Sequence, residues 1–152
     1  NIPASGAPAL VHNDYKLDNL MLDPIDPGRV VAVLDWEMAT VGDPMADLGL
    51  SLCYWLHAGS PGSEHNQVTG LPRAEGWFTR ERFLSRYVAQ TGRGISSIGW
   101  HEVLGVLKLA VILQQIYYRY AKGQTSDIRF KDFHLRVGVL CATAWQLMVE
   151  LR

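Results

Sequence analysis

The sequence has 152 residues, of which 48% are hydrophobic and 19% charged. This is enough apolar material for a packed core and too much for a disordered chain. Its 14 Lys and Arg residues nearly balance 15 Asp and Glu residues, for a net charge of −1, which argues against charge-driven binding of nucleic acid. The two cysteines lie far apart and form neither a disulfide framework nor a zinc pattern, so we expect a reducing, cytoplasmic environment.

The first third of the sequence is predicted to form short strands joined by turns. Residues 9–12 and 19–22 are short apolar runs, and residues 23–28 (Asp-Pro-Ile-Asp-Pro-Gly) are dense in turn formers. A β-branched run follows at residues 30–34. We therefore expect residues 19–22 and 30–34 to pair as a hairpin.

After Asp43 the apolar residues recur at helical spacing. Asp43 is a suitable N-cap with Pro44 at the first helical position, and Thr79 is a suitable N-cap for a helix that ends at Gly92. The segment between these helices, residues 57–76, is rich in Gly, Pro and Ser and is predicted to be a long loop, either functional or disordered. The predicted helices cover residues 44–56, 79–92, 99–121 and 130–151.

Together these elements predict an α+β fold, in which a small β-hairpin platform is followed by about four helices. The helix over residues 99–121 is apolar on most faces and should be the central one. The longest apolar run, residues 103–113, is interrupted by Lys108 and is too short to span a bilayer. We therefore expect neither a membrane nor a nucleic acid as a partner.

The most informative stretch is residues 12–19, His-Asn-Asp-Tyr-Lys-Leu-Asp-Asn, which has the His-x-Asp-x-x-x-x-Asn spacing of a kinase catalytic loop. Asp35 follows at the end of the second hairpin strand. Phosphoryl transfer needs one carboxylate to receive the hydroxyl proton, and oxygen ligands to hold Mg²⁺ against the phosphates. Asp14, Asn19 and Asp35 supply this set, and hairpin pairing would place Asn19 beside Asp35.

Three ordered motifs, at residues 11–19, 33–37 and 42–49, resemble the aminoglycoside phosphotransferase and choline kinase superfamily. The sequence Asp-Trp-Glu, followed by Gly-Asp-Pro-x-x-Asp-Leu, most resembles the branch of kinase domains fused to acyl-CoA dehydrogenases. The likeness covers residues 10–56, and the helical remainder is compatible with it. It implies a protein-kinase-like C-terminal lobe.

The resemblance also implies roles for the residues of these motifs. Asp14 resembles the catalytic base, and Asn19 and Asp35 resemble the two metal ligands. Lys16 resembles the loop lysine near the transferred phosphate, although a solvent-exposed lysine fits the sequence equally well. The implied cofactors are ATP, contacted by Lys16, Asn19 and Asp35, and Mg²⁺.

Two further residues resemble the structural support of such a loop. His12 resembles the histidine that packs under it, and Asp47 resembles the carboxylate at a helix start that braces it by hydrogen bonds. Asn13 departs from the Gly that is commoner at its position. Residues 117–120 (Tyr-Tyr-Arg-Tyr) either line an acceptor pocket or, as aromatic residues on a central helix more often do, belong to the core.

No Gly-rich phosphate loop and no Val-Ala-x-Lys strand occur in these 152 residues. We therefore expect a C-terminal lobe whose N-terminal lobe is absent, with the catalytic loop and metal-binding hairpin in residues 1–42 and a helical subdomain in residues 43–152. The isolated chain is expected to be inactive, and an apolar face left by the missing lobe would favour a homodimer.

The resulting functional hypothesis is an ATP-dependent phosphotransferase. It would move the γ-phosphate to a hydroxyl of a small molecule, and the branch resemblance suggests a hydroxyacyl-CoA or a related metabolite. The alternative is a catalytically silent helical interaction or remnant domain of kinase ancestry. A metal-dependent hydrolase comes third, because it would need more carboxylate or His ligands than this hairpin offers.

Overall fold

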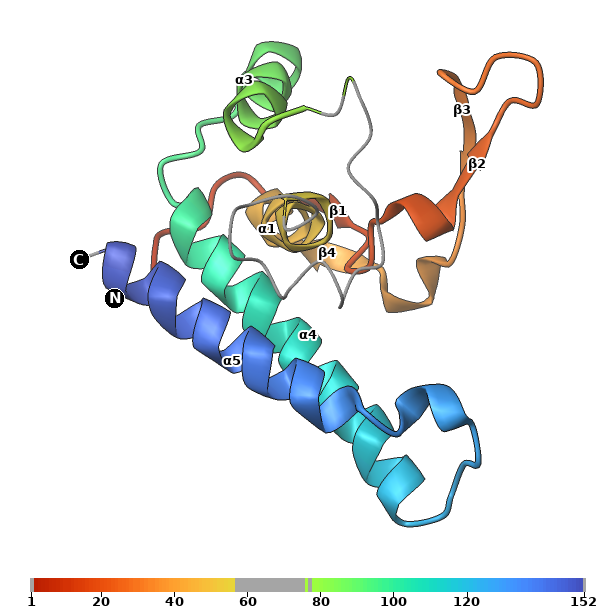
Figure 1. Ribbon diagram of the computed structural model, residues 1–152. Helices are drawn as coiled ribbons and strands as arrows, with labels where there is room; N and C mark the ends of the chain where they lie inside the picture. Colours follow the sequence, from red (N-terminus) through yellow and green to blue (C-terminus); the bar gives the residue numbers. More distant parts are fainter. Residues whose placement is uncertain (1, 57–75, 77, 152) are drawn as a thin grey trace.

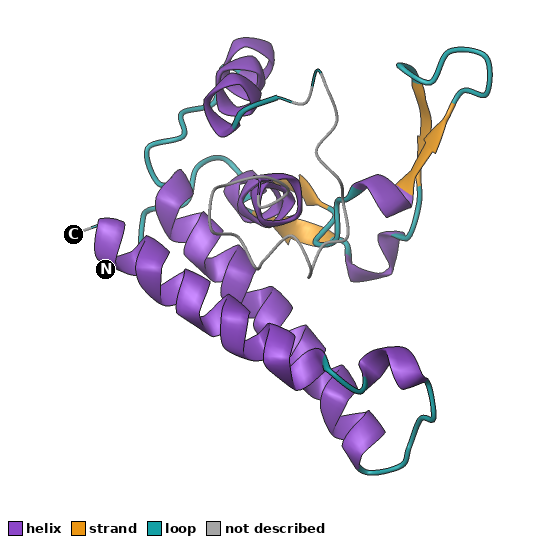
Figure 2. Ribbon diagram, viewed as in Figure 1, coloured by secondary structure: helices purple, strands orange, loops and turns teal. Residues whose placement is uncertain are grey.

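The computed structural model describes residues 2–56, 76 and 78–151. Within these residues it confirms the predicted α+β class, with four α-helices and two small antiparallel strand pairs (Figures 1 and 2). The helices are α1 (Pro44–Leu56), α3 (Arg80–Thr91), α4 (Ile98–Ala121) and α5 (Phe133–Glu150). The strands are β1 (Ala9–Val11), β2 (Leu20–Leu22), β3 (Val30–Val33) and β4 (Thr40–Gly42), and short 3-10 helices are η1 (Leu17–Asn19), η2 (Trp36–Met38) and η3 (Ile128–Phe130).

The predicted hairpin is confirmed as the pair β2–β3. Leu20 lies opposite Val33, and the register shifts between Met21 and Leu22. This hairpin extends away from the helices at the right of Figure 1. The second pair, β1–β4, was not predicted. It aligns Val11 with Thr40 and packs against α1, so both ends of the segment from residue 9 to residue 42 are attached to the helical body.

The helix boundaries follow the predicted caps. The Oδ1 atom of Asp43 accepts a hydrogen bond of 2.9 Å from the Met45 amide at the start of α1. The Thr79 side chain accepts one from the Arg82 amide, and Gly92 ends α3 in the left-handed conformation, with φ of 67°. The predicted loop over residues 57–76 lies, except for residue 76, outside the described residues.

Helix α4 is central, as predicted, and has its most extensive contacts with α5 and α1. Figure 1 shows α4 and α5 side by side, with α1 seen end-on next to α4. Two glycines allow the crossing of α1 and α4. A Cβ atom on Gly49 would overlap the carbonyl oxygen of His101, and one on Gly105 would lie 3.0 Å from the Gly49 backbone. One side of the crossing is filled by a buried cluster: Cys53, Val106, Leu109, Ala110, Leu113, Leu140 and Ala144.

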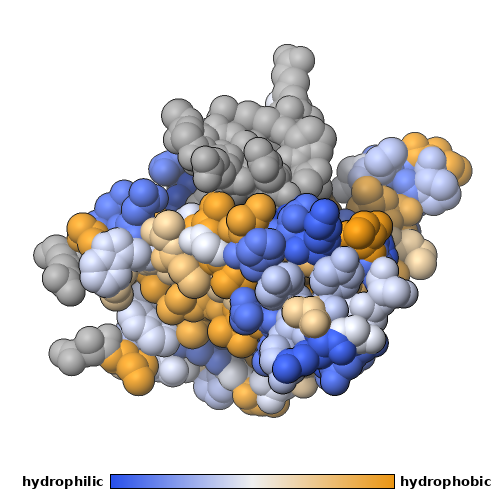
Figure 3. Space-filling view, turned by 60° about the horizontal axis from the view of Figure 1, so that its bottom comes forward, coloured by the Kyte–Doolittle hydropathy of each residue, from blue (hydrophilic) through white to orange (hydrophobic). Residues whose placement is uncertain are grey.

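The last helix starts later than predicted. It begins at Phe133, because Asp127 accepts a hydrogen bond from the Arg129 amide and starts the separate turn η3. Leu140 and Ala144 are the fully buried residues of this helix, whereas Trp145 is 62% exposed. Figure 3 shows apolar surface gathered in the middle of one face. None of the described helices is long and apolar enough to cross a membrane.

Candidate active site

His12 anchors the loop that follows β1. Its ring is buried, and Nδ1 accepts a hydrogen bond of 3.2 Å from the Asp14 amide. The ring hydrogen is therefore on Nε2, which donates to the Leu34 carbonyl at 2.7 Å. The ring also lies 4.7 Å from that of Trp36. The imidazole thus joins the start of the loop to the end of β3, and both of its nitrogens form hydrogen bonds with backbone groups.

Asp47 holds the same loop from the first turn of α1. Its Oδ2 atom accepts a hydrogen bond from the His12 amide at 2.5 Å, and its Oδ1 atom accepts one from the Asn13 amide at 2.6 Å. Asn13 has a left-handed backbone, with φ of 66°, which Asn tolerates better than most residues. One carboxylate therefore fixes the direction of two consecutive peptide groups immediately before Asp14.

The carboxylate of Asp14 is surrounded by donors. Oδ2 accepts hydrogen bonds from Lys16 Nζ at 2.7 Å and from Asn19 Nδ2 at 3.1 Å. Oδ1 accepts one from the Tyr54 hydroxyl at 3.2 Å. These contacts bring together three of the predicted site residues, Asp14, Lys16 and Asn19, around one carboxylate.

Asn19 and Asp35 lie at the base of the β2–β3 hairpin. The Asn19 side chain is buried, and its Nδ2 also donates to the Asp14 carbonyl at 2.9 Å, which leaves the amide oxygen as its remaining ligand atom. The Asn19 carbonyl accepts a hydrogen bond of 2.8 Å from the Leu34 amide, so Asp35 follows directly after the residue paired with Asn19.

Asp35 has an unusual backbone conformation for a non-glycine residue, with φ of 62° and ψ of 58°. Such conformations cluster at functional sites. Its side chain is exposed, it does not cap η2, and no hydrogen bond or ion pair joins it to the other described residues. Unlike the carboxylate of Asp14, that of Asp35 is therefore available to a ligand.

The residues present fit a magnesium ion that takes most of its ligands from elsewhere. Asn19 and Asp35 offer two oxygen ligands, and Mg²⁺ is commonly held by one or two side chains together with water and substrate phosphates. Within the described part of the chain, no group of three or more His, Cys, Asp or Glu residues could hold a metal ion by itself.

Sequence reasoning missed three residues that contact the loop from the helices. Tyr54 binds Asp14, and Ser51 Oγ donates to the Tyr15 carbonyl at 3.1 Å. From α4, Lys108 Nζ donates to the Asn13 carbonyl at 2.7 Å. Only Lys108 had a visible signal, a charge inside the longest apolar run.

Burial changes the acid–base behaviour of two of these side chains. Burial, followed by the negative charge of Asp14, raises the pKa of the Tyr54 hydroxyl well above its usual range. Tyr54 is therefore a neutral donor at physiological pH. Burial lowers the pKa of Lys108, although the nearby charges of Asp47 and Asp14 oppose the shift.

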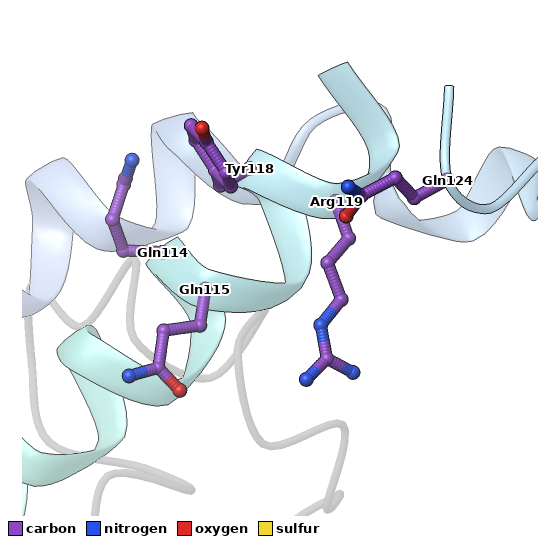
Figure 4. A pocket seen from close by; sticks show the side chains of 5 residues that line it. All are labelled: Gln114, Gln115, Tyr118, Arg119 and Gln124. Atoms are coloured by element: carbon purple, nitrogen blue, oxygen red, sulfur yellow. The ribbon is translucent and has the colours of Figure 1, made fainter. Parts of the chain in front are cut away.

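Two surface grooves lie apart from this carboxylate. One, of about 390 Å³ and shown in Figure 4, lies along the second half of α4. Tyr118, which lines it, is 56% exposed, so the expectation of a core position is wrong for this residue. The second, of about 400 Å³, lies between the segment before β1 and the segment before α4. Neither is lined by Asp14, Lys16, Asn19 or Asp35. The residues around the first groove are Gln114, Gln115, Tyr118, Arg119 and Gln124.

Comparison with known proteins gives a consistent result. The model of the phosphotransferase enzyme family (APH) matches residues 1–101. The chain is 36% identical to acyl-CoA dehydrogenase family member 10 of Mus musculus, over 99% of this chain and 14% of that protein. It is 38% identical to acyl-CoA dehydrogenase family member 11 of Rattus norvegicus, over 84% of this chain and 16% of that protein.

A solved structure is also similar. It is the crystal structure of a Ralstonia eutropha protein with a provisional assignment as an aminoglycoside phosphotransferase. The two share 32% sequence identity with a TM-score of 0.79, over 94% of this chain and 43% of the other. These matches confirm the resemblance drawn from the three motifs, including the branch associated with acyl-CoA dehydrogenases. The chain spans about one sixth of the length of the curated relatives named above.

Proposed function

The chain belongs to the phosphotransferase enzyme family, and from this premise we propose that it carries the catalytic loop of an ATP-dependent kinase that acts on a hydroxyl of a small molecule. The observation that supports this best is the setting of Asp14. Its carboxylate is held by Lys16, Asn19 and Tyr54, and the adjacent hairpin offers Asn19 and Asp35 as ligands. A carboxylate to receive a proton and a neighbouring pair of oxygen ligands are what phosphoryl transfer requires of this lobe.

In this proposal each residue has a distinct task. Asp14 orients the acceptor hydroxyl and receives its proton. Asn19 and Asp35 would hold Mg²⁺, which supplies charge neutralisation at the phosphates when it is bound. The Lys16 ammonium, 2.7 Å from Asp14, would contact the transferred phosphate. His12 and Asp47 hold the loop backbone and do not contact the reacting atoms.

We further propose a hydroxyacyl-CoA, or a related metabolite, as the acceptor. The support is the kind of protein in which similar segments occur, because both mammalian relatives are named as acyl-CoA dehydrogenase family members. A kinase acting on the hydroxyl of an acyl-CoA would work on the same class of compound as a dehydrogenase in the same chain. The catalytically silent alternative is not favoured, because the positions of the base and of both ligands are intact.

The test is a coupled assay of ADP formation by the intact protein with ATP, Mg²⁺ and a set of hydroxyacyl-CoA thioesters that differ in the position of the hydroxyl. We expect ADP to form with one or more of them, and not with the matched acyl-CoA that lacks the hydroxyl. ADP formation that is independent of any acceptor would contradict a kinase. The 152-residue chain alone should be inactive, because it contains no Gly-rich loop to cover the phosphates.

A further inference from the structure

Helix α1 contacts every residue of the loop from His12 to Tyr15. Asp47 binds the amides of His12 and Asn13, Ser51 binds the carbonyl of Tyr15, and Tyr54 binds the side chain of Asp14. Asp47, Ser51 and Tyr54 are spaced four and then three residues apart, so they lie on one face of the helix in successive turns. Tyr54 is the only one of the three that contacts the carboxylate itself.

The hydrogen-bond donors are distributed unequally over the two carboxylate oxygens of Asp14. An ionised carboxylate has about four lone-pair positions, two on each oxygen. Lys16 and Asn19 both donate to Oδ2, which fills it. Oδ1 accepts from Tyr54 alone among the described residues, so its second lone pair is the position that is left for a further donor.

We propose that Oδ1 of Asp14 is the atom that receives the proton of the acceptor, and that Tyr54 is the positioning residue that orients it. This inference rests on the proposed kinase function. In the step, the acceptor O–H bond breaks and its proton moves to Oδ1. The acceptor oxygen forms a bond to the γ-phosphorus of ATP, and the bond from that phosphorus to the β,γ-bridging oxygen breaks and releases ADP.

The surroundings of Tyr54 keep its hydroxyl in this role. Burial, followed by the charge of Asp14, raises the pKa of the phenol further above neutral pH, so the Tyr54 hydroxyl remains a donor to Oδ1. The Lys16 ammonium lies 5.6 Å from the centre of the Tyr54 ring, within the range of a cation–π contact. The Lys16 ammonium therefore packs against the Tyr54 ring, while Lys16 binds Oδ2 of Asp14 and Tyr54 binds Oδ1.

The proposal is tested by Tyr54→Phe in the intact protein, assayed with ATP, Mg²⁺ and the hydroxyacyl-CoA that supports turnover. The ring and its packing remain, and only the donor is lost. We expect kcat to fall about 10- to 150-fold, as for the loss of one hydrogen bond to a charged group, with the KM values of both substrates within twofold of the wild type. The matched control is Tyr87→Phe in α3, a tyrosine that packs against a separate buried cluster and should leave kcat unchanged.

A double-mutant cycle shows whether Tyr54 acts through Asp14. A lost general base leaves roughly 10⁻²–10⁻⁴ of the wild-type rate, which a long incubation can measure. In the Asp14→Asn background, Tyr54→Phe should have no further effect, because the carboxylate that it orients is gone. An equal loss in both backgrounds, or a Tyr54→Phe enzyme with wild-type kcat, would overturn the inference while leaving the kinase function intact. A wild type without acceptor-dependent turnover overturns the proposed function and this inference with it.

Discussion

The Nζ atom of Lys108 lies 2.7 Å from the carbonyl oxygen of Asn13, a residue 95 positions earlier in the chain. Asp47, on α1, accepts a hydrogen bond from the amide of Asn13. The peptide groups on the two sides of this residue, which has a left-handed backbone, are therefore held by a negative charge from α1 and a positive charge from α4. Lys108 reaches the loop because Gly49 and Gly105 allow α4 to approach α1 closely. A helix crossing therefore determines the position of the loop that carries Asp14.

Replacement of Lys108 by Met should weaken activity more than stability. We expect kcat to fall at least tenfold, because small shifts of a reacting group are costly. The free energy of unfolding should fall by only about 1 kcal/mol, because the cost of burying the charge, which lowers the pKa of this lysine, disappears together with its hydrogen bond. Turnover assays and urea melts measure the two effects. Lys122→Met, a change at the end of α4 far along the helix from the loop, is the matched control.

Asp14→Asn and Asp35→Asn should both disable the intact protein, but for different reasons. The first removes the proton acceptor and should lower kcat by roughly 10²–10⁴-fold at every Mg²⁺ concentration. The second removes one charged ligand, so its defect should ease at high Mg²⁺. Steady-state assays across a Mg²⁺ series, with thermal melts as the folding control, separate them. An identical response of the two variants to Mg²⁺ would contradict the division of roles.

Magnesium binding in the absence of nucleotide should be weak. Asn19 and Asp35 supply two protein oxygens, and sites of this kind depend on substrate phosphates for the remaining charge. Titration calorimetry should detect no binding tighter than about the millimolar range. Binding in the micromolar range would show that a different set of residues holds the metal.

The close approach of α1 and α4 makes Gly49 sensitive to any side chain. Gly49→Ala should lower the free energy of unfolding by about 1–3 kcal/mol, because its Cβ would force the helices apart. Gly138→Ala is the matched control in α5. Nothing lies within 4 Å of its added methyl, so the higher helix propensity of Ala should stabilise the chain by up to about 1 kcal/mol. Urea melts of both variants compare them, and equal effects would contradict the packing account.

The two cysteines should differ sharply in reactivity. Burial raises the pKa of the Cys53 thiol to about 12, whereas Cys141 is exposed. At pH 8 a thiol reagent should modify Cys141 within minutes and leave Cys53 unmodified until the chain unfolds, because the thiolate is the reactive form. Mass spectrometry after labelling, with and without denaturant, distinguishes the two sites. Rapid labelling of Cys53 in the folded protein would contradict its burial.

Much of the local structure could be predicted from short stretches of sequence. The caps Asp43, Thr79 and Gly92 act on residues within one turn of themselves, and the turn at residues 23–28 brings its flanking strands together. The spacing of the loop motif likewise located Asp14 and Asn19. The caps and the hairpin depend on interactions between residues close in sequence, and therefore the sequence alone determined them.

The tertiary structure decided the contacts between distant residues. Tyr54 lies 40 positions from Asp14 and Lys108 lies 95 positions from Asn13. Neither pairing has a local signal, because both depend on how α1 and α4 cross. The pairing of β1 with β4 and the exposure of Tyr118 were likewise visible only in the tertiary structure. The sequence determined which groups could take part in the chemistry, whereas the helix crossing decided how they are oriented, because a packed interface brings together residues that no sequence spacing connects.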